Sequence, residues 1–358
     1  MKGPALGLLF ALAACEPRPA APEAGRPRAP DSDAARIHVI DVGQGAATLF
    51  ELPCGAVLVD TGGETNDEFD SGKALVDYLD RFFARRADLN RTIDLLVLTH
   101  PHLDHTRNVE LVAKGYTVKG VLTDGRTGGS GGQEQHWLEE WAARSARFET
   151  ISADRVASGG STDAIIDPLN CGAVDPAIRV LWGGVSEKPE GWSDKAFHNH
   201  NNHSVVLRVD FGRASFLVSG DLEEAGISAV IAKHHGTGAL DVDVWEVSHH
   251  GSYNGTTREL LGELSPHFVL IPMGPPERPG RWTAWGFGHP RKKAIDLLAA
   301  AVDRARPAAL VHVGSAMHHF DDYRVERAIY ATGWDGDVVI SGTAAGDYRV
   351  ETSRKLHE

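Results

Sequence analysis

The stretch LLVLTHPHLDH, residues 95–105, carries the most distinctive side chains of the whole sequence. Its apolar start predicts a buried strand, and open α/β folds place functional side chains where such strands end. His100 and His102 are spaced to hold one ion between two imidazoles, and Asp104 and His105 to hold a second ion nearby. Imidazole together with carboxylate is a ligand set that suits Zn²⁺ and similar divalent ions. The stretch therefore predicts a metal site at the edge of a sheet.

Polar side chains also follow three other predicted strands. Asp60 ends an apolar run, Asp221 follows a second one, and His249 and His250 follow a third. Asp221 is suited to contact both ions, because a carboxylate has two oxygens and the preceding Gly220 lets the backbone approach closely. The second ion still lacks a neutral ligand, which the pair at 249–250 would supply.

Strands and helices alternate along most of the chain. The hydrophobic patterns predict strands over 36–42, 47–52, 56–60, 94–98, 118–123, 179–182, 205–211, 214–218, 242–247, 268–271, 309–313 and 338–340. They predict helices over 71–86, 108–114, 134–147, 223–233, 257–264 and 291–302. This order indicates a single α/β domain with two sheets packed face to face and helices outside, a four-layer αββα sandwich.

The first residues have the layout of a secretory signal, with Lys2, an apolar segment and the small residues before Cys15. Residues 12–15 resemble a bacterial lipobox, which implies cleavage before Cys15 and lipidation of its thiol. The Pro- and Ala-rich segment that follows predicts an extended spacer. We therefore expect a signal peptide over 1–14, a lipid-anchored spacer over 15–35 and a globular domain over 36–358. The protein would be exported and held on a membrane, facing the periplasm or the exterior.

Cysteine content and charge bear on disulfide formation and on the binding of anionic partners. Cys54 and Cys171 form either a disulfide or two buried thiols, and the sequence leaves both open. The net charge of −13 does not attract polyanions by its overall field. A local basic cluster is nevertheless suited to bind a phosphate: Arg278, Arg281, Arg291, Lys292 and Lys293.

The chain resembles the metallo-β-lactamase superfamily, and within it the hydrolase domain of ComEC-type competence proteins. The motifs that carry the resemblance are VIDVGQG (39–45), VLVDTGG (57–63), LLVLTHPHLDH (95–105), NNHSVVLRVDFGRASFLVSGDLE (201–223), DVWEVSHHGS (243–252) and GFGHP (286–290). The resemblance covers about residues 36–300, and it implies the αββα fold for the domain over 36–358 and a centre with two divalent ions. Zinc is the expected metal, with manganese or iron as alternatives.

Roles for the motif residues follow from the resemblance. It implies that the ions are bound by His100, His102, Asp104, His105, Asp221 and either member of the 249–250 pair. We take His250 as the ligand and His249 as the proton donor, although an exchange of the two stays open. Catalytic roles are expected for His249, Asp104 and His203, and His203 is either a ligand or a solvated loop histidine.

Further residues are expected around this centre. Asp60 and Ser252 belong to two of the motifs and would support the ligands. Substrate-binding side chains are expected in the C-terminal loop, with plain loop packing as the alternative for the two tryptophans: His289, Trp282, Trp285 and Arg281. Where the family has an apolar residue and two glycines after the last ligand, this chain has residues 106–108 as Thr-Arg-Asn, so the pocket floor differs.

The resemblance implies a hydrolase in which two ions lower the pKa of a shared water and aim the resulting hydroxide at a phosphodiester, and the N-terminal signal would make this hydrolase lipid-anchored. The expected substrate is a nucleic acid or a headgroup-bearing lipid or glycan, with no obligate protein partner. Two alternatives stay open. One is a catalytically weak ComEC-like module that binds DNA or cell-wall polymer, and the other is a lactone or β-lactam hydrolase.

Overall fold

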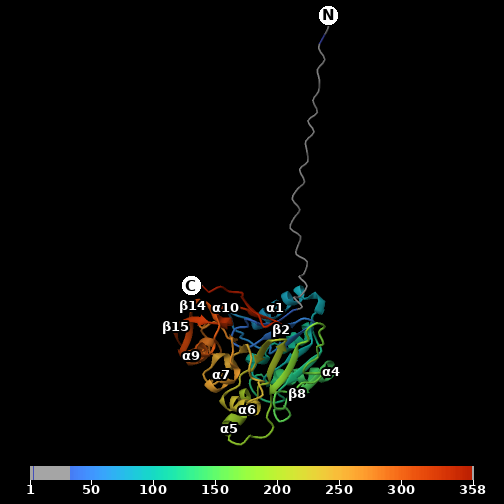
Figure 1. Cartoon of the computed structure of the whole chain (residues 1–358), viewed down its shortest axis with the longest axis vertical. Helices are drawn as coiled ribbons and strands as arrows, with labels where there is room; N and C mark the ends of the chain where they lie inside the picture. Colours follow the sequence, from blue (N-terminus) through green and yellow to red (C-terminus); the bar gives the residue numbers. More distant parts are fainter. Residues whose placement is uncertain (1–2, 4–32, 357–358) are drawn as a thin grey trace.

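The structure, a computed structural model, describes Gly3 and residues 33–356. Two sheets pack face to face, and helices cover their outer faces (Figure 1). The first sheet has the order β18-β17-β1-β2-β3-β5-β7-β8. Its strands are β1 (Ala34–Val39), β2 (Thr48–Leu52), β3 (Gly55–Val59), β5 (Leu95–Val97), β7 (Gly120–Thr123), β8 (Arg147–Thr150), β17 (Val338–Thr343) and β18 (Tyr348–Thr352).

The second sheet has the order β16-β13-β12-β11-β10-β9. Its strands are β9 (Ala177–Trp182), β10 (Val206–Phe211), β11 (Ala214–Val218), β12 (Val244–Glu246), β13 (Phe268–Ile271) and β16 (Ile329–Ala331). Apolar side chains of both sheets share one core, in which Phe50 and Phe216 meet edge to face with ring centroids 6.1 Å apart. The architecture is therefore the αββα sandwich that the sequence predicts.

Each outer face is covered by helices whose buried side chains repeat with helical spacing. The first sheet carries α1 (Ser71–Arg85), α3 (Val109–Gly115) and α4 (Gly132–Ser145), and the second carries α6 (Glu224–His234), α7 (Arg258–Leu264) and α9 (Lys292–Ala301). Asp70 starts α1 by accepting a hydrogen bond from the backbone N–H of Lys73. Leu75, Leu79 and Phe82 then form the buried stripe of this helix.

Short elements complete the chain. They are the strands β4 (Thr92–Ile93) and β6 (Thr117–Val118), the helices α2 (Leu103–Thr106), α5 (Asp194–His198), α8 (Ala284–Phe287) and α10 (Thr332–Asp335), and the 3-10 turns η1 (Ala87–Leu89), η2 (His200–His203) and η3 (Ser248–Gly251). No helix among residues 33–356 is both long and apolar enough to cross a bilayer. The proposed signal peptide and nearly all of the spacer lie outside the described residues.

The sandwich brings the predicted functional loops to one rim. Strands β3, β5 and β7 run parallel in the first sheet, and β11, β12 and β13 run parallel in the second. Parallel strands end at the same edge of a sheet, so the segments after β3, β5, β11 and β12 meet there. These are the segments that carry Asp60, residues 100–105, Asp221 and the 249–250 pair.

Two parts of the chain differ from the sequence-based expectation. The first strand begins at Ala34, inside the range assigned to the spacer. The C-terminal part contains a long hairpin of β14 (Ala305–Ala316) and β15 (His319–Arg327), of which only 309–313 was predicted as a strand. The two strands form a sheet of their own, and β15 exposes many charged side chains, so most of the hairpin lacks the apolar pattern that marks a core strand.

Cys54 and Cys171 form a disulfide, which decides between the two alternatives that the sequence left open. The bond ties the turn between β2 and β3 to the irregular segment before β9, 117 residues later. A cross-link of this span restricts the unfolded chain strongly.

Replacing both cysteines with alanine is expected to lower the free energy of unfolding by about 2–4 kcal/mol, because a long loop is released in the unfolded state. Urea denaturation of the oxidised wild type and of the variant measures this difference. Wild-type protein with its disulfide reduced should match the variant. A variant within about 0.5 kcal/mol of the oxidised protein would contradict the expectation.

Candidate metal centre

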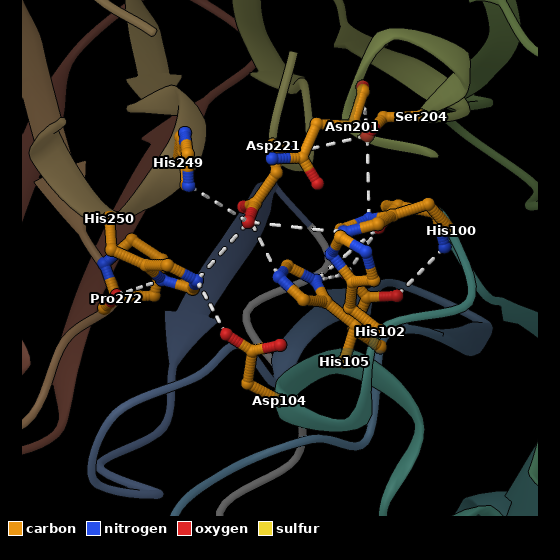
Figure 2. Close-up of polar contacts among 12 residues, drawn as sticks. His100, His102, Asp104, His105, Asn201, Ser204, Asp221, His249, His250 and Pro272 are labelled. Atoms are coloured by element: carbon orange, nitrogen blue, oxygen red, sulfur yellow. Dashed lines mark hydrogen bonds and ion pairs between the residues drawn. The ribbon is translucent and has the colours of Figure 1, made fainter. Parts of the chain in front are cut away.

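Asp221 lies in the middle of the converging loops (Figure 2). Its Oδ1 is 3.1 Å from His105 Nε2, and its Oδ2 is 3.4 Å from His250 Nε2 and 3.9 Å from His100 Nε2. Asp104 closes the other side, with Oδ2 3.4 Å from His250 Nε2. Ligand atoms of four residues lie within 4.8 Å of one another: Asp104, His105, Asp221 and His250.

Hydrogen bonds on the far side of two rings fix which nitrogen faces this centre. His105 donates from Nδ1 to Asp60 Oδ2 at 2.7 Å, and His250 donates from Nδ1 to the Pro272 carbonyl oxygen at 2.7 Å. Each ring, in its neutral form, therefore turns the lone pair of Nε2 toward Asp221, and both Nε2 atoms are buried with no hydrogen-bond partner in the described chain. Lone pairs buried against carboxylates repel them unless a positive charge intervenes. The donor set thus fits a divalent cation.

His100 and His102 present a second pair of nitrogens. His100 Nε2 and His102 Nδ1 lie 3.0 Å apart. His100 Nδ1 is 3.1 Å from Thr99 Oγ1, and that hydroxyl already donates to Asp60 Oδ2 at 2.8 Å. His100 Nδ1 is therefore the donor to Thr99, and the lone pair of its Nε2 faces His102. Two imidazole nitrogens that face each other in this way fit one ion between them.

The charges of the chain itself favour positive charge at this point. Burial raises the pKa of Asp221, but His105 and His250 outweigh burial and hold that pKa well below its usual range. Burial lowers the pKa of His250, but Asp221 and Asp104 outweigh burial and raise it to about 10. The carboxylates therefore stay ionised and are balanced by a cation, either an imidazolium or a bound metal.

His249 occupies a different place from His250. Its side chain is 22% exposed, with Nε2 3.9 Å from Asp221 Oδ2 and Nδ1 3.4 Å from Glu223 Oε1. Both histidines have a φ of 53°, and this left-handed turn directs the two rings to different sides. His250 is the member that lies among the carboxylates, whereas His249 faces an open cavity. The geometry favours His250 as the ligand and His249 as the proton donor.

Two of the expected site residues do not reach the centre. His203 is fully buried, with Nδ1 accepting from the backbone N–H of Val185 at 3.0 Å and Nε2 donating to the Phe197 carbonyl oxygen at 2.7 Å. Both ring nitrogens are in use, so the ligand and catalytic roles expected of His203 are wrong. The Ser252 hydroxyl donates to Asn254 Oδ1 at 2.6 Å and not to a ligand, whereas its backbone N–H donates to the His249 carbonyl oxygen at 2.8 Å and so closes the turn that carries the 249–250 pair. Asp60 does contact a ligand, through His105.

A cavity of about 660 Å³ opens beside the centre. Asp104, Asp221 and His249 line its inner side, and Arg281 and Trp282 line its rim. The Trp282 side chain is 63% exposed, and the guanidinium carbon of Arg281 lies 4.7 Å from its ring centroid. The structure thus brings these two expected substrate-binding residues to the cavity.

The other two expected substrate-binding residues lie elsewhere. Trp285 stacks on His318 with ring centroids 4.1 Å apart, and neither side chain lines the cavity. His289 is only 6% exposed, and its ring stacks on Phe287. It lies behind His249, with ring centroids 5.8 Å apart. Trp285 and His289 therefore pack against other rings, and neither lines the cavity as a substrate-binding side chain would.

The basic residues of the C-terminal loop do not form one phosphate site. Arg278 pairs with Glu64 at 3.1 Å, and Lys292 pairs with Asp296 at 2.8 Å. Of the five described side chains in this cluster, Arg281 alone lines the cavity. The expectation of a joint phosphate site was wrong. These basic side chains are close in sequence, but they point in different directions from the loop and from the helix that follows it.

Arg107 and Asn201 also line the cavity, although neither was among the site residues expected from the sequence. Arg107 follows Asp104 by three positions, a spacing that places both on one helical face. Asn201 donates from Nδ2 to Glu223 Oε1 at 2.7 Å, while its Oδ1 is buried without a partner in the described chain. The helical spacing from Asp104 could have predicted that Arg107 faces the cavity. The sequence pattern around Asn201 gave no indication of where its side chain points.

Comparisons with known proteins show to which family the chain is similar. A family model described as the metallo-beta-lactamase superfamily matches residues 40–271. ComE operon protein 3 of Bacillus subtilis (strain 168) is 28% identical over 283 residues, which cover 75% of this chain and 31% of that protein. Recombination protein 2 of Haemophilus influenzae is 24% identical over 262 residues, covering 71% of this chain and 25% of that protein. The chain thus spans at most about a third of the length of these relatives.

Among solved structures, the metallo-beta-lactamase fold protein YhfI from Bacillus subtilis is similar with a TM-score of 0.38 and 13% sequence identity. The match covers 66% of this chain and 85% of that one.

Proposed function

Since the chain belongs to the metallo-β-lactamase superfamily, whose members are metal-dependent hydrolases, we propose that it is a dinuclear phosphodiesterase. The observation that carries this proposal is the convergence of Asp221 with imidazole nitrogens whose lone pairs have no protein partner. A catalytic centre also needs room for a substrate, and the adjoining cavity supplies it.

The residues divide into two ligand groups. His100 and His102 would hold one ion, Asp104, His105 and His250 the other, and Asp221 would contact both. Two divalent ions held there would supply a water of lowered pKa and would stabilise charge on the phosphoryl oxygens. Zinc suits this donor set, and manganese and iron are the alternatives.

The chain itself would orient the substrate and move a proton. His249 lines the cavity beside Asp221, and in this proposal its Nε2 would give a proton to the leaving oxygen. Glu223 lies against Nδ1 of the same ring and would keep the imidazole in this orientation. At the rim, Trp282 offers an exposed indole face to a base or a headgroup, and Arg281 offers a positive charge to a phosphate.

We also propose that the protein is an exported lipoprotein anchored through Cys15. The layout of the first fifteen residues supports this proposal, and so does the disulfide, because such bonds persist in oxidising compartments. Growth with a clickable palmitate analogue should label the wild type, while a Cys15→Ala variant should stay unlabelled. Equal labelling of both proteins would rule out this anchor.

The catalytic proposal predicts turnover of phosphodiesters by metal-loaded protein. Bis-p-nitrophenyl phosphate, single-stranded DNA and p-nitrophenyl phosphorylcholine are the test substrates, and chelation of the metal should lower the rate by at least about 100-fold. Cleavage of a lactone or a β-lactam without turnover of any phosphodiester would move the reaction to C–O or C–N bonds. Fewer than one ion per chain, measured by mass spectrometry after aerobic and anaerobic loading, would favour a binding module for DNA or cell-wall polymer.

A further inference from the structure

We infer that Arg107 forms an anion-binding subsite inside the cavity, which selects substrates that carry a second phosphate next to the phosphodiester that is cleaved. This inference rests on the proposed function, because it concerns which phosphodiesters the same cavity accepts. Arg107 stands where the sequence departs from the family pattern, directly after the last ligand of the 100–105 loop.

The backbone directs Arg107 to the same side as a proposed ligand. Arg107 has φ −43° and ψ −40°, and its N–H donates to the Leu103 carbonyl oxygen at 3.0 Å, so the helical turn of α2 continues through it. Residues three apart on a helix are neighbours, with about 5–6 Å between their Cβ atoms. Asp104 and Arg107 therefore leave the turn side by side, and both line the 660 Å³ cavity.

The guanidinium of Arg107 is held in place but not neutralised. Its Nε donates to the Gly63 carbonyl oxygen at 2.9 Å, which fixes the plane of the group. Within residues 33–356, no carboxylate forms an ion pair with it, and its two terminal nitrogens have no protein acceptor. The side chain is half-buried, so it has also lost part of its hydration. A charged donor in this situation is completed by an anionic ligand.

The other charged groups near Arg107 already have partners. Glu64 lines the same cavity, but it accepts from Arg278 Nη1 at 3.1 Å and from the backbone N–H of Gln44 at 3.0 Å. Asp104 and Asp221 face the histidines of the proposed metal centre. Arg107 is therefore free to bind substrate.

The shape of the group defines the ligand. A guanidinium presents its N–H donors as a planar fork that matches two oxygens of one phosphate. Because Arg107 is a neighbour of Asp104, a phosphate bound by the guanidinium would be the next phosphate along the substrate from the phosphodiester at the metal centre. A substrate with two successive phosphates occupies both positions, whereas a diester with a single phosphate leaves the fork empty.

The test compares two dinucleotides that differ only in the second phosphate. They are thymidylyl-thymidine with and without a 5′-phosphate, each assayed with metal-loaded wild type, Arg107→Gln and Arg107→Lys. The wild type should have a KM about 10- to 100-fold lower for the phosphorylated dinucleotide, because the guanidinium donates charge-assisted hydrogen bonds to the second phosphate. Arg107→Gln should abolish this difference with kcat changed by less than about threefold, and Arg107→Lys should retain part of it.

Arg144→Gln is the matched control, since it removes the same charge from an exposed position on α4 outside the cavity lining. It should preserve the preference for the phosphorylated dinucleotide. Equal KM values for the two dinucleotides in the wild type would overturn the inference without any variant, and so would an equal effect of Arg107→Gln on both. If the wild type cleaves neither dinucleotide nor any other phosphodiester, the proposed function itself fails.

Discussion

Asp221→Asn should abolish hydrolysis, lowering kcat/KM by at least about 10³-fold, which corresponds to about 4 kcal/mol of lost transition-state stabilisation. Asp221 is the carboxylate of the described chain that reaches both ligand groups, with Oδ1 near His105 and Oδ2 near His250 and His100. Asparagine keeps the shape but offers a single neutral oxygen. Bound metal should therefore also fall, from two ions per chain to one or fewer.

Turnover of bis-p-nitrophenyl phosphate and metal content by mass spectrometry measure these two effects separately. Asp347→Asn is a suitable control, because it makes the same chemical change at an exposed turn between β17 and β18. Its rate and metal content should equal those of the wild type. An Asp221→Asn protein that keeps its fold, both ions and a rate within about tenfold of wild type would refute the bridging role.

The fold and the centre of this site were predictable because their signals are local or periodic. Four of the six proposed ligands lie in one six-residue loop, and the apolar run before it marks the end of a strand. Asp221 and the 249–250 pair follow equally clear runs, and parallel strands bring such ends to one rim. Knowledge of where strands end is therefore enough to assemble the centre.

Side-chain direction in irregular segments was not predictable from the same signals. His203 is next to Ser204 in a recognisable motif, yet the η2 turn directs its ring toward Val185 and Phe197. Trp285 is equally plausible as a substrate contact until the hairpin of β14 and β15 is known, because its stacking partner His318 lies at the tip of that hairpin. Such contacts join segments that no sequence periodicity relates.

The same limit applies to buried charge in the body of the fold. Glu51 reads as a polar residue near the end of a predicted strand, but its side chain is 1% exposed in the first sheet. It accepts from Arg85 at 2.8 and 2.7 Å and from Arg86 at 3.2 Å. Arg86 itself is completely buried. This cluster joins α1 to β2, and an arginine left in it without its carboxylate partner would be a buried, unpaired charge.

Glu51→Gln should lower the free energy of unfolding at pH 7 by about 3–5 kcal/mol, the cost of removing one partner from a buried ion pair. Asp88→Asn is the matched control. Asp88 also pairs with Arg86, at 2.8 Å, but its side chain is 48% exposed, so its loss should amount to less than about 1 kcal/mol. Urea denaturation of metal-free protein measures both. Equal losses for the two variants would show that the burial of Glu51 has no energetic consequence.

The pH dependence of the stability difference between wild type and Glu51→Gln supplies an independent check. Burial raises the pKa of Glu51, but His38 and Arg85 outweigh burial and hold the pKa well below its usual range. A lowered pKa in the folded state stabilises the protein above the unfolded pKa of about 4.3, and this stabilisation is lost as the pH falls toward the folded pKa. The gap between wild type and Glu51→Gln should thus be constant near neutrality and shrink below pH 4.3 by about 1.4 kcal/mol per pH unit. A gap that widens in acid would mean that Glu51 is protonated in the folded protein, and the ion-pair explanation would then be wrong.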